Sequence, residues 1–174
     1  RSSVISTWAE TDPEGALEWV REQSKEGKLS DGDFGMGAGM YYYTIFTSLA
    51  TKDVNSAFEE FDSFKGENRQ MALVGMAQGL NSSEDRRHFL KLVDGLESNS
   101  DKQMAYSSVI SQWVMYEPEA AVTFIDELED GEQKEQIVQR LKSTWLSMDP
   151  ANAADWVMKN TREETKEEAI DDIV

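Results

Sequence analysis

The chain of 174 residues contains no cysteine, one histidine and three prolines. Without cysteine it can form no disulfide, no thiolate metal site and no thiol nucleophile. So few prolines argue against a long flexible linker. No apolar run approaches the roughly 20 residues that a membrane helix needs. We therefore expect a chain with no membrane-spanning segment and no cysteine chemistry.

Basic residues are also scarce. The 17 Lys and Arg are outnumbered by 34 Asp and Glu, which gives a formal net charge of −17. Phosphate binding needs clustered Lys and Arg, and here they are scattered, so we expect neither nucleic acid nor an anionic membrane surface as a partner. A basic partner, or simple solubility, suits this charge better. The hydrophobic share of 39% and the 11 glycines together exclude wholesale disorder.

A short pattern recurs along the chain. A Trp precedes an acidic residue and Pro by four residues; an Ala follows the Pro by three residues, and an aromatic residue follows the Ala by three more. Two weaker copies have Leu at the Trp position, four residues before Asp53 and Glu84. The spacings between successive markers are 41, 31, 33 and 32 residues. Five copies with one period indicate a repeat array. The markers are Trp8, Leu49, Leu80, Trp113 and Trp145.

Each copy predicts a helical hairpin. An acidic residue before Pro is typical of a helix start, with the carboxylate as N-cap and Pro in the first turn, and apolar residues on both sides recur at helical spacing. We predict first helices over 2–10, 38–51, 68–80, 101–115 and 132–147. We predict second helices over 13–26, 54–64, 83–96, 117–129 and 150–160. The second helices are expected to end near Gly27, Gly66, Gly95 and Gly131.

No segment indicates a strand, so the predicted fold class is all-α. The arrangement resembles the tetratricopeptide and HEAT-like α-solenoid class over essentially the whole chain. The period and the hairpin match the tetratricopeptide class, but that family begins its first helix with Trp-x₂-Leu-Gly-x₂-Tyr, whereas here Trp ends the first helix. The resemblance implies a right-handed α-solenoid of about five helix-turn-helix repeats, with a period of about 31–41 residues and a concave surface that binds protein segments.

The ends of the chain do not look like the polar caps of a finished array. We therefore expect residues 1–174 to be a single α-solenoid repeat domain and a fragment of a longer array. Apolar repeat faces at the cut ends would favour self-association of the fragment.

Candidate site residues come from the one irregular spacing. The first interval holds about 8–10 extra residues between Lys25 and Gly39, and insertions in repeat arrays gather on one face, often the binding face. Phe34 lies in this insertion. Tyr43 follows it. A column is the set of residues that occupy the same position in each repeat copy, and the column of Tyr43 is mostly polar in the other copies. We predict Phe34 and Tyr43 as partner-binding anchors.

No constellation of side chains indicates catalysis, a metal or a cofactor. His88 has no Ser, Cys or second His at catalytic or metal-ligand spacing, so we interpret it as an edge histidine. Carboxylate pairs such as Glu59 and Glu60 follow from the acidic composition and are interpreted as solvated helix faces. The segment 31–35 fails as a calcium loop, because its fifth position is Gly35 and its twelfth is Tyr42.

We expect a non-enzymatic helical-repeat scaffold that binds a protein or peptide, with a basic partner favoured by electrostatics. The alternative is a structural spacer in a larger protein, with no dedicated ligand. An enzyme of acidic-glycosidase type ranks third, because it needs two carboxylates in a deep cleft. The lack of cysteine and the acidity suit an exported bacterial protein and a cytoplasmic protein equally well.

Overall fold

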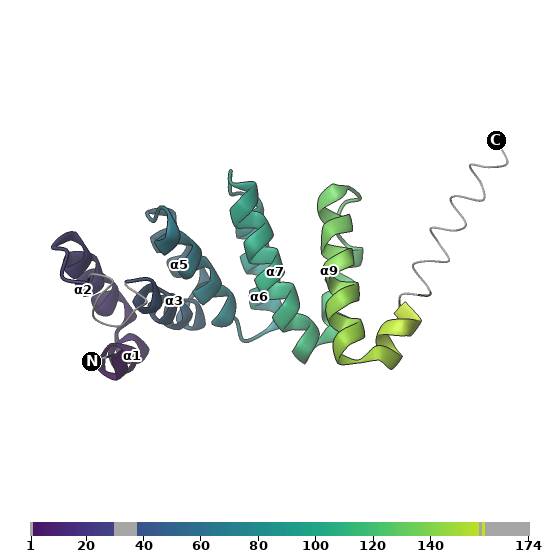
Figure 1. Ribbon diagram of the computed structural model, residues 1–174, viewed down its shortest axis with the longest axis horizontal. Coiled ribbons are helices and arrows are strands. Elements are labelled where there is room, and N and C mark those ends of the chain that lie inside the picture. Colours follow the sequence, from purple (N-terminus) through teal and green to yellow (C-terminus); the bar gives the residue numbers. More distant parts are fainter. Residues whose placement is uncertain (1, 30–37, 157, 159–174) are drawn as a thin grey trace. The chain divides into compact units, whose positions relative to one another are not determined.

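The computed structural model describes residues 2–29, 38–156 and 158 (Figure 1). Within these ranges every regular element is a helix, which confirms the all-α prediction. No described helix is both long and apolar enough to cross a membrane. The chain divides into two compact units, Arg1–Val109 and Ile110–Val174, which are described separately below as the N-terminal unit and the C-terminal unit.

The helix bounds follow the predicted ones to within three residues wherever both ends are described. The N-terminal unit holds α1 (Ser2–Thr11), α2 (Pro13–Lys25), α3 (Gly39–Lys52), α4 (Val54–Asp62), α5 (Glu67–Gln78), α6 (Ser83–Asp94) and most of α7 (Asn99–Tyr116). The C-terminal unit holds the last residues of α7, then α8 (Pro118–Asp126), α9 (Glu132–Met148) and helical residues at 150–156.

Asp12 and Asp53 cap the second helices with their side chains, as predicted, whereas Glu117 occupies the N-cap position of α8 without a side-chain cap bond. The Asp12 carboxylate accepts a hydrogen bond from the Gly15 amide at 3.0 Å. The Asp53 carboxylate accepts one from the Asn55 amide at 3.0 Å. These bonds satisfy amides that a helix start otherwise leaves without an intrahelical acceptor. Helix initiation therefore explains the acidic residue at Asp12 and at Asp53.

The third copy begins two residues earlier than its alignment on Glu84 implies. Ser82 is the N-cap of α6, and its hydroxyl accepts a hydrogen bond from the Asp85 amide at 3.1 Å. Counted from this cap, the position that holds a small Ala in the other copies holds Arg86, not His88. Arg86 is buried, with 4% exposure.

Two of the four predicted helix-ending glycines have a different role. Gly27 and Gly95 do follow the ends of α2 and α6, whereas Gly66 and Gly131 are the N-caps of α5 and α9. After α2, the amide of Gly27 bonds to Ser24 O and the amide of Lys28 bonds to Gln23 O. This double pattern is the Schellman motif, with Gly27 at φ +67°.

Four of the five repeat markers are buried, namely Leu49, Leu80, Trp113 and Trp145, and Trp8 is half-buried. Where both marker positions are aromatic, the two rings of one hairpin pack together; their centroid distances are 6.2 Å for Trp8–Trp19, 5.4 Å for Trp113–Phe124 and 5.8 Å for Trp145–Trp156. The small column is fully buried and consists of Ala16, Ala57, Ala121 and Ala153. Both observations confirm that these columns pack the helices against one another.

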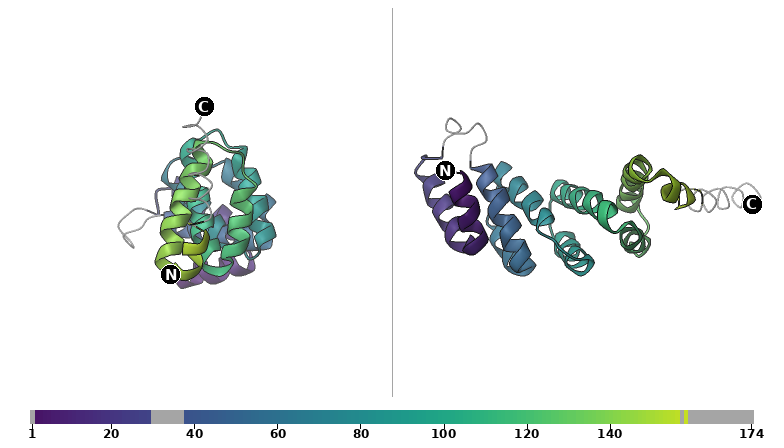
Figure 2. Two further views of the ribbon diagram at one scale, coloured as in Figure 1. Left: turned by 90° about the vertical axis from the view of Figure 1, so that its right-hand side faces the viewer. Right: turned by 90° about the horizontal axis from the view of Figure 1, so that it is seen from below.

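In the N-terminal unit, α3 packs against α1, α2, α4 and α5 (Figures 1 and 2). The approach to α5 is unusually close, because a Cβ added at Gly75 or Gly79 would overlap the carbonyl oxygens of Tyr43 or Thr47. The Thr47 hydroxyl lies 2.8 Å from Tyr43 O and 3.0 Å from Gly75 O, so it can donate to either helix. The hydroxyl of Thr51 is placed in the same way one turn later.

A half-buried arginine joins three elements of this unit. Arg69 on α5 pairs through Nε with the Asp101 carboxylate on α7 at 2.8 Å. Its guanidinium lies over the Phe61 ring of α4, 4.1 Å from the centroid, and donates to the carbonyl oxygen of Phe64 at 3.1 Å. Asp101 is 7% exposed. The ion pair is thus shielded from water, and it fixes the ends of α4, α5 and α7 together.

Candidate partner-binding surface

Of the two predicted anchors, Phe34 lies outside the described residues. Tyr43 is half-buried on α3, and its backbone forms part of the crossing with α5. Met40, one turn earlier, is 41% exposed and shares a helix face with Tyr43. Tyr41 is also half-buried. The binding role of Phe34 and Tyr43 stays a prediction.

His88 occupies an exposed position on α6 and makes a structural contact. Its Nε2 lies 2.8 Å from Asn55 Oδ1 on α4. The nearby Asp53 carboxyl has a pKa below its usual range, chiefly because it accepts hydrogen bonds from the Ser56 hydroxyl and the Asn55 amide, with a smaller contribution from His88. Within residues 2–29, 38–156 and 158, no three His, Asp or Glu side chains converge as metal ligands.

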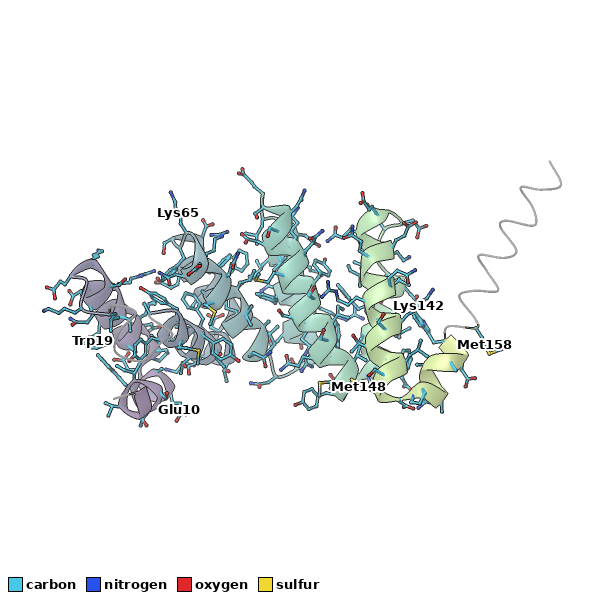
Figure 3. All side chains as sticks on the ribbon, viewed as in Figure 1. Glu10, Trp19, Lys65, Lys142, Met148 and Met158 are labelled. Carbon is cyan, nitrogen blue, oxygen red and sulfur yellow. The ribbon has the colours of Figure 1, made fainter. Side chains whose placement is uncertain are left out.

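The large apolar side chains that unit Ile110–Val174 exposes gather mainly at two helix ends. Met115 and Tyr116 end α7 with 58% and 68% exposure, and Leu146 and Met148 lie in the last turn of α9 with 42% and 45% exposure. Both helices end on the same side in Figure 1, and Figure 3 shows Met148 at that end of α9. We call these four residues the apolar edge. Their exposure leaves them available for contact with another molecule.

Comparison of the hairpins shows that packing does not require an apolar residue directly before the N-cap of the second helix. The residue directly before the N-cap is Thr11 in the first hairpin and Lys52 in the second, and both are exposed. The equivalent residues in the fourth and fifth hairpins are Tyr116 and Met148. Two residues before the cap, Glu10 and Thr51 correspond to Met115 and Ser147. One exposed position is therefore polar in the first two hairpins and apolar in the last two.

The apolar edge has carboxylates near it in sequence and no cation. Residues 113–121 and 145–156 include no Lys, Arg or His. They do include four acidic residues. Glu117 and Glu119 lie at the cap and in the first turn of α8, Asp149 precedes the helical segment 150–156, and Asp155 lies in the second turn of that segment. Of these, Asp149 is half-buried and accepts a hydrogen bond from the Asn152 side chain at 2.8 Å, and the others are exposed. The edge thus combines soft apolar side chains with negative charge.

Sequence reasoning did not find the apolar edge. Phe34 and Tyr43 were predicted from the one irregular repeat length, whereas the signal for the edge lies in the residues just before each cap. Thr11 and Lys52 stand there in the first two hairpins, and Tyr116 and Met148 in the last two. No known family model, curated protein or solved structure matches the chain.

Proposed function

We propose that this protein is a non-enzymatic helical-repeat scaffold that binds a protein or peptide segment. In this proposal the five hairpins form a right-handed α-solenoid. The regular period, the recurring caps and the paired rings inside the hairpins support that arrangement. The apolar edge is the binding surface we propose for the C-terminal unit, and Phe34 and Tyr43 remain candidate anchors in the N-terminal unit.

The observation that carries the proposal is the change of chemistry at one repeat position. Tyr116 is 68% exposed and Met148 is 45% exposed, although the same position is occupied by Thr11 and Lys52 elsewhere. Exposing apolar side chains has a free-energy cost in water and favours aggregation. Aromatic residues and Met are enriched in protein interfaces, and Met adapts to partners of different shape.

Selection of random peptides displayed on phage against the immobilised 174-residue chain tests this function. Enriched peptides would be synthesised and their affinities measured by calorimetry for the wild-type chain and for Tyr116→Thr/Met148→Thr, which copies the residue of the first hairpin. We expect the double variant to lose at least tenfold in affinity. The matched control is Thr11→Ser/Lys52→Gln, which changes the same position in the first two hairpins and should bind as the wild type does.

Tyr43→Ala tests the predicted anchor in the other unit with the same peptides. If no peptide is enriched above an uncoated surface, the scaffold proposal fails and the structural-spacer hypothesis becomes the better one. If peptides are enriched but bind the edge variant unchanged, the chain is a binding module whose surface lies elsewhere.

A further inference from the structure

We infer that the apolar edge binds a cationic amphipathic α-helix of a partner protein. The inference rests on the proposed function and goes further, because it specifies the secondary structure and the charge of the segment that binds. Its basis is the combination in unit Ile110–Val174 of four exposed apolar side chains, Met115, Tyr116, Leu146 and Met148, with the exposed carboxylates of Glu119 and Asp155.

The charge of the partner follows from what surrounds the edge. Glu119 and Asp155 are exposed, and they lie in the ranges 113–121 and 145–156, which contain no Lys, Arg or His. The whole chain is also strongly acidic, with a formal charge of −17. A segment rich in Lys or Arg would be attracted and oriented by this field, whereas an acidic segment would be repelled.

The helical form of the partner follows from the backbone of this chain. An extended peptide gains affinity by adding main-chain hydrogen bonds to an exposed sheet edge. The described residues offer no strand, and helix backbones use most of their amide and carbonyl groups internally. A peptide that forms its own helix satisfies its backbone without help and presents apolar side chains at i, i+3, i+4 and i+7 to a surface.

The side chains of the edge suit such a helix. Methionine is unbranched and adapts its shape to apolar partners, and Met-rich surfaces are used where a protein binds amphipathic helices. Tyr116 adds an aromatic ring whose hydroxyl can remain in water while its face is covered. A cationic helix with one apolar face would therefore cover the four edge residues and place its Lys or Arg near the carboxylates.

Three fluorescently labelled synthetic peptides of equal length test the inference by anisotropy with the 174-residue chain. The first places Leu at i, i+3, i+4 and i+7 and Lys elsewhere; the second has the same residues in scrambled order; the third replaces every Lys with Glu. We expect the first to bind at least tenfold more tightly than either other peptide and to gain helical circular dichroism on binding. Raising the salt concentration should weaken it.

Two variants of the chain separate the two contributions. Tyr116→Thr/Met148→Thr preserves all charges and should weaken the first peptide about tenfold or more. Glu119→Gln/Asp155→Asn preserves the edge and should weaken it while reducing the salt dependence. Equal binding of the scrambled peptide would overturn the inference, because attraction would then be diffuse, and so would equal binding of the Glu peptide.

A second copy of this chain is the competing occupant of the apolar edge. If sedimentation shows a dimer of the wild type that Tyr116→Thr/Met148→Thr converts to a monomer, the edge is covered by the chain itself and the inference fails. The proposed function has a separate test, since it fails only if no displayed peptide of any chemistry binds the chain. Edge-dependent binding of neutral or acidic displayed peptides would preserve the function and overturn only the cationic helix.

Discussion

The carbonyl oxygen of Tyr43 on α3 lies against Gly75 on α5, with no room between them for a side-chain carbon. Gly79 approaches Thr47 in the same way one turn later, so the two helices meet backbone to backbone along a Gly-x₃-Gly row. Threonine hydroxyls within hydrogen-bond distance of carbonyls on both helices reinforce this contact. The crossing determines where the first turns of α3, which carry Met40 and Tyr43, lie relative to α5.

We expect Gly75→Ala to destabilise the fold by about 1–3 kcal/mol, the usual cost of overpacking. The direction is diagnostic, because Gly→Ala inside a helix ordinarily stabilises by about 0.5–1 kcal/mol. Urea unfolding followed by far-ultraviolet circular dichroism measures the difference. Gly131→Ala is the control, since open space surrounds a Cβ at Gly131, and only the poorer N-cap preference of Ala should lower its stability, by less than about 1 kcal/mol. A stabilised Gly75→Ala variant would show that α3 and α5 are not in this close contact.

The Arg69–Asp101 pair predicts a second, independent effect on stability. Asp101→Asn removes the charge from a hydrogen bond that is 2.8 Å long and largely shielded from solvent, and a hydrogen bond to a charged group contributes about 1.5–3 kcal/mol. We expect a loss of that size in urea unfolding. Replacing both partners, as in Arg69→Met/Asp101→Leu, should recover part of it, because no unpaired buried charge remains. If Arg69→Met/Asp101→Leu lost more free energy of unfolding than Arg69→Met and Asp101→Leu lose together as single variants, this interpretation would be contradicted.

Alkaline pH should weaken the fold through Tyr106. Its hydroxyl donates to the Asp94 carboxylate at 2.7 Å, and burial together with this bond and the negative charge raises the pKa of Tyr106. An unfolded tyrosine ionises near pH 10. Above that pH the unfolded chain releases a proton that the folded chain retains, so stability falls as pH rises. Below it, this group contributes no pH dependence.

Urea midpoints measured between about pH 8 and pH 11 test the sign, on either side of the ordinary tyrosine pKa. Tyr106→Phe should be less stable at neutral pH by about 1 kcal/mol, the net value of one hydrogen bond, and should lose stability less steeply above pH 10. Part of the decline should persist, because burial also raises the pKa of Tyr42. An unchanged slope in Tyr106→Phe would mean that other groups cause the alkaline loss.

The helices could be predicted from sequence because their boundaries depend on local chemistry. Asp12 before Pro13 specifies a helix start through one carboxylate and one fixed backbone angle, and the structure has both. The core columns could be predicted because a repeat samples each position several times. Trp113 and Ala121 are therefore recognisable as core without knowledge of which helices touch.

The features that escaped prediction depend on contacts between elements. Gly75 looks like a weak point in a helix until Tyr43 is found against it. Arg86 occupies a buried position that is Ala elsewhere, and it was missed because the cap of α6 is Ser82 and not an acidic residue before Pro. Asp101 looks like one more acidic residue of an acidic chain, and only the approach of Arg69 explains its burial.

Substitutions in the apolar edge should weaken peptide binding without lowering the stability of the fold. Met115→Glu/Tyr116→Thr transfers the residues of the first hairpin, Glu10 and Thr11, to the end of α7. Because both edge side chains are more than half exposed and the first hairpin forms the same α-helical end with polar residues, little packing is lost. Surface substitutions of this kind change the free energy of unfolding by less than about 0.5 kcal/mol. We expect urea unfolding of this variant to match the wild type while its affinity for selected peptides falls.

Val114→Thr is the contrasting control, since Val114 is 3% exposed on the same helix, and burial of a hydroxyl there should destabilise the fold by about 1–3 kcal/mol. If the surface variant instead unfolded as easily as the control, Met115 and Tyr116 would be structural residues, and their apolar character would no longer point to a partner.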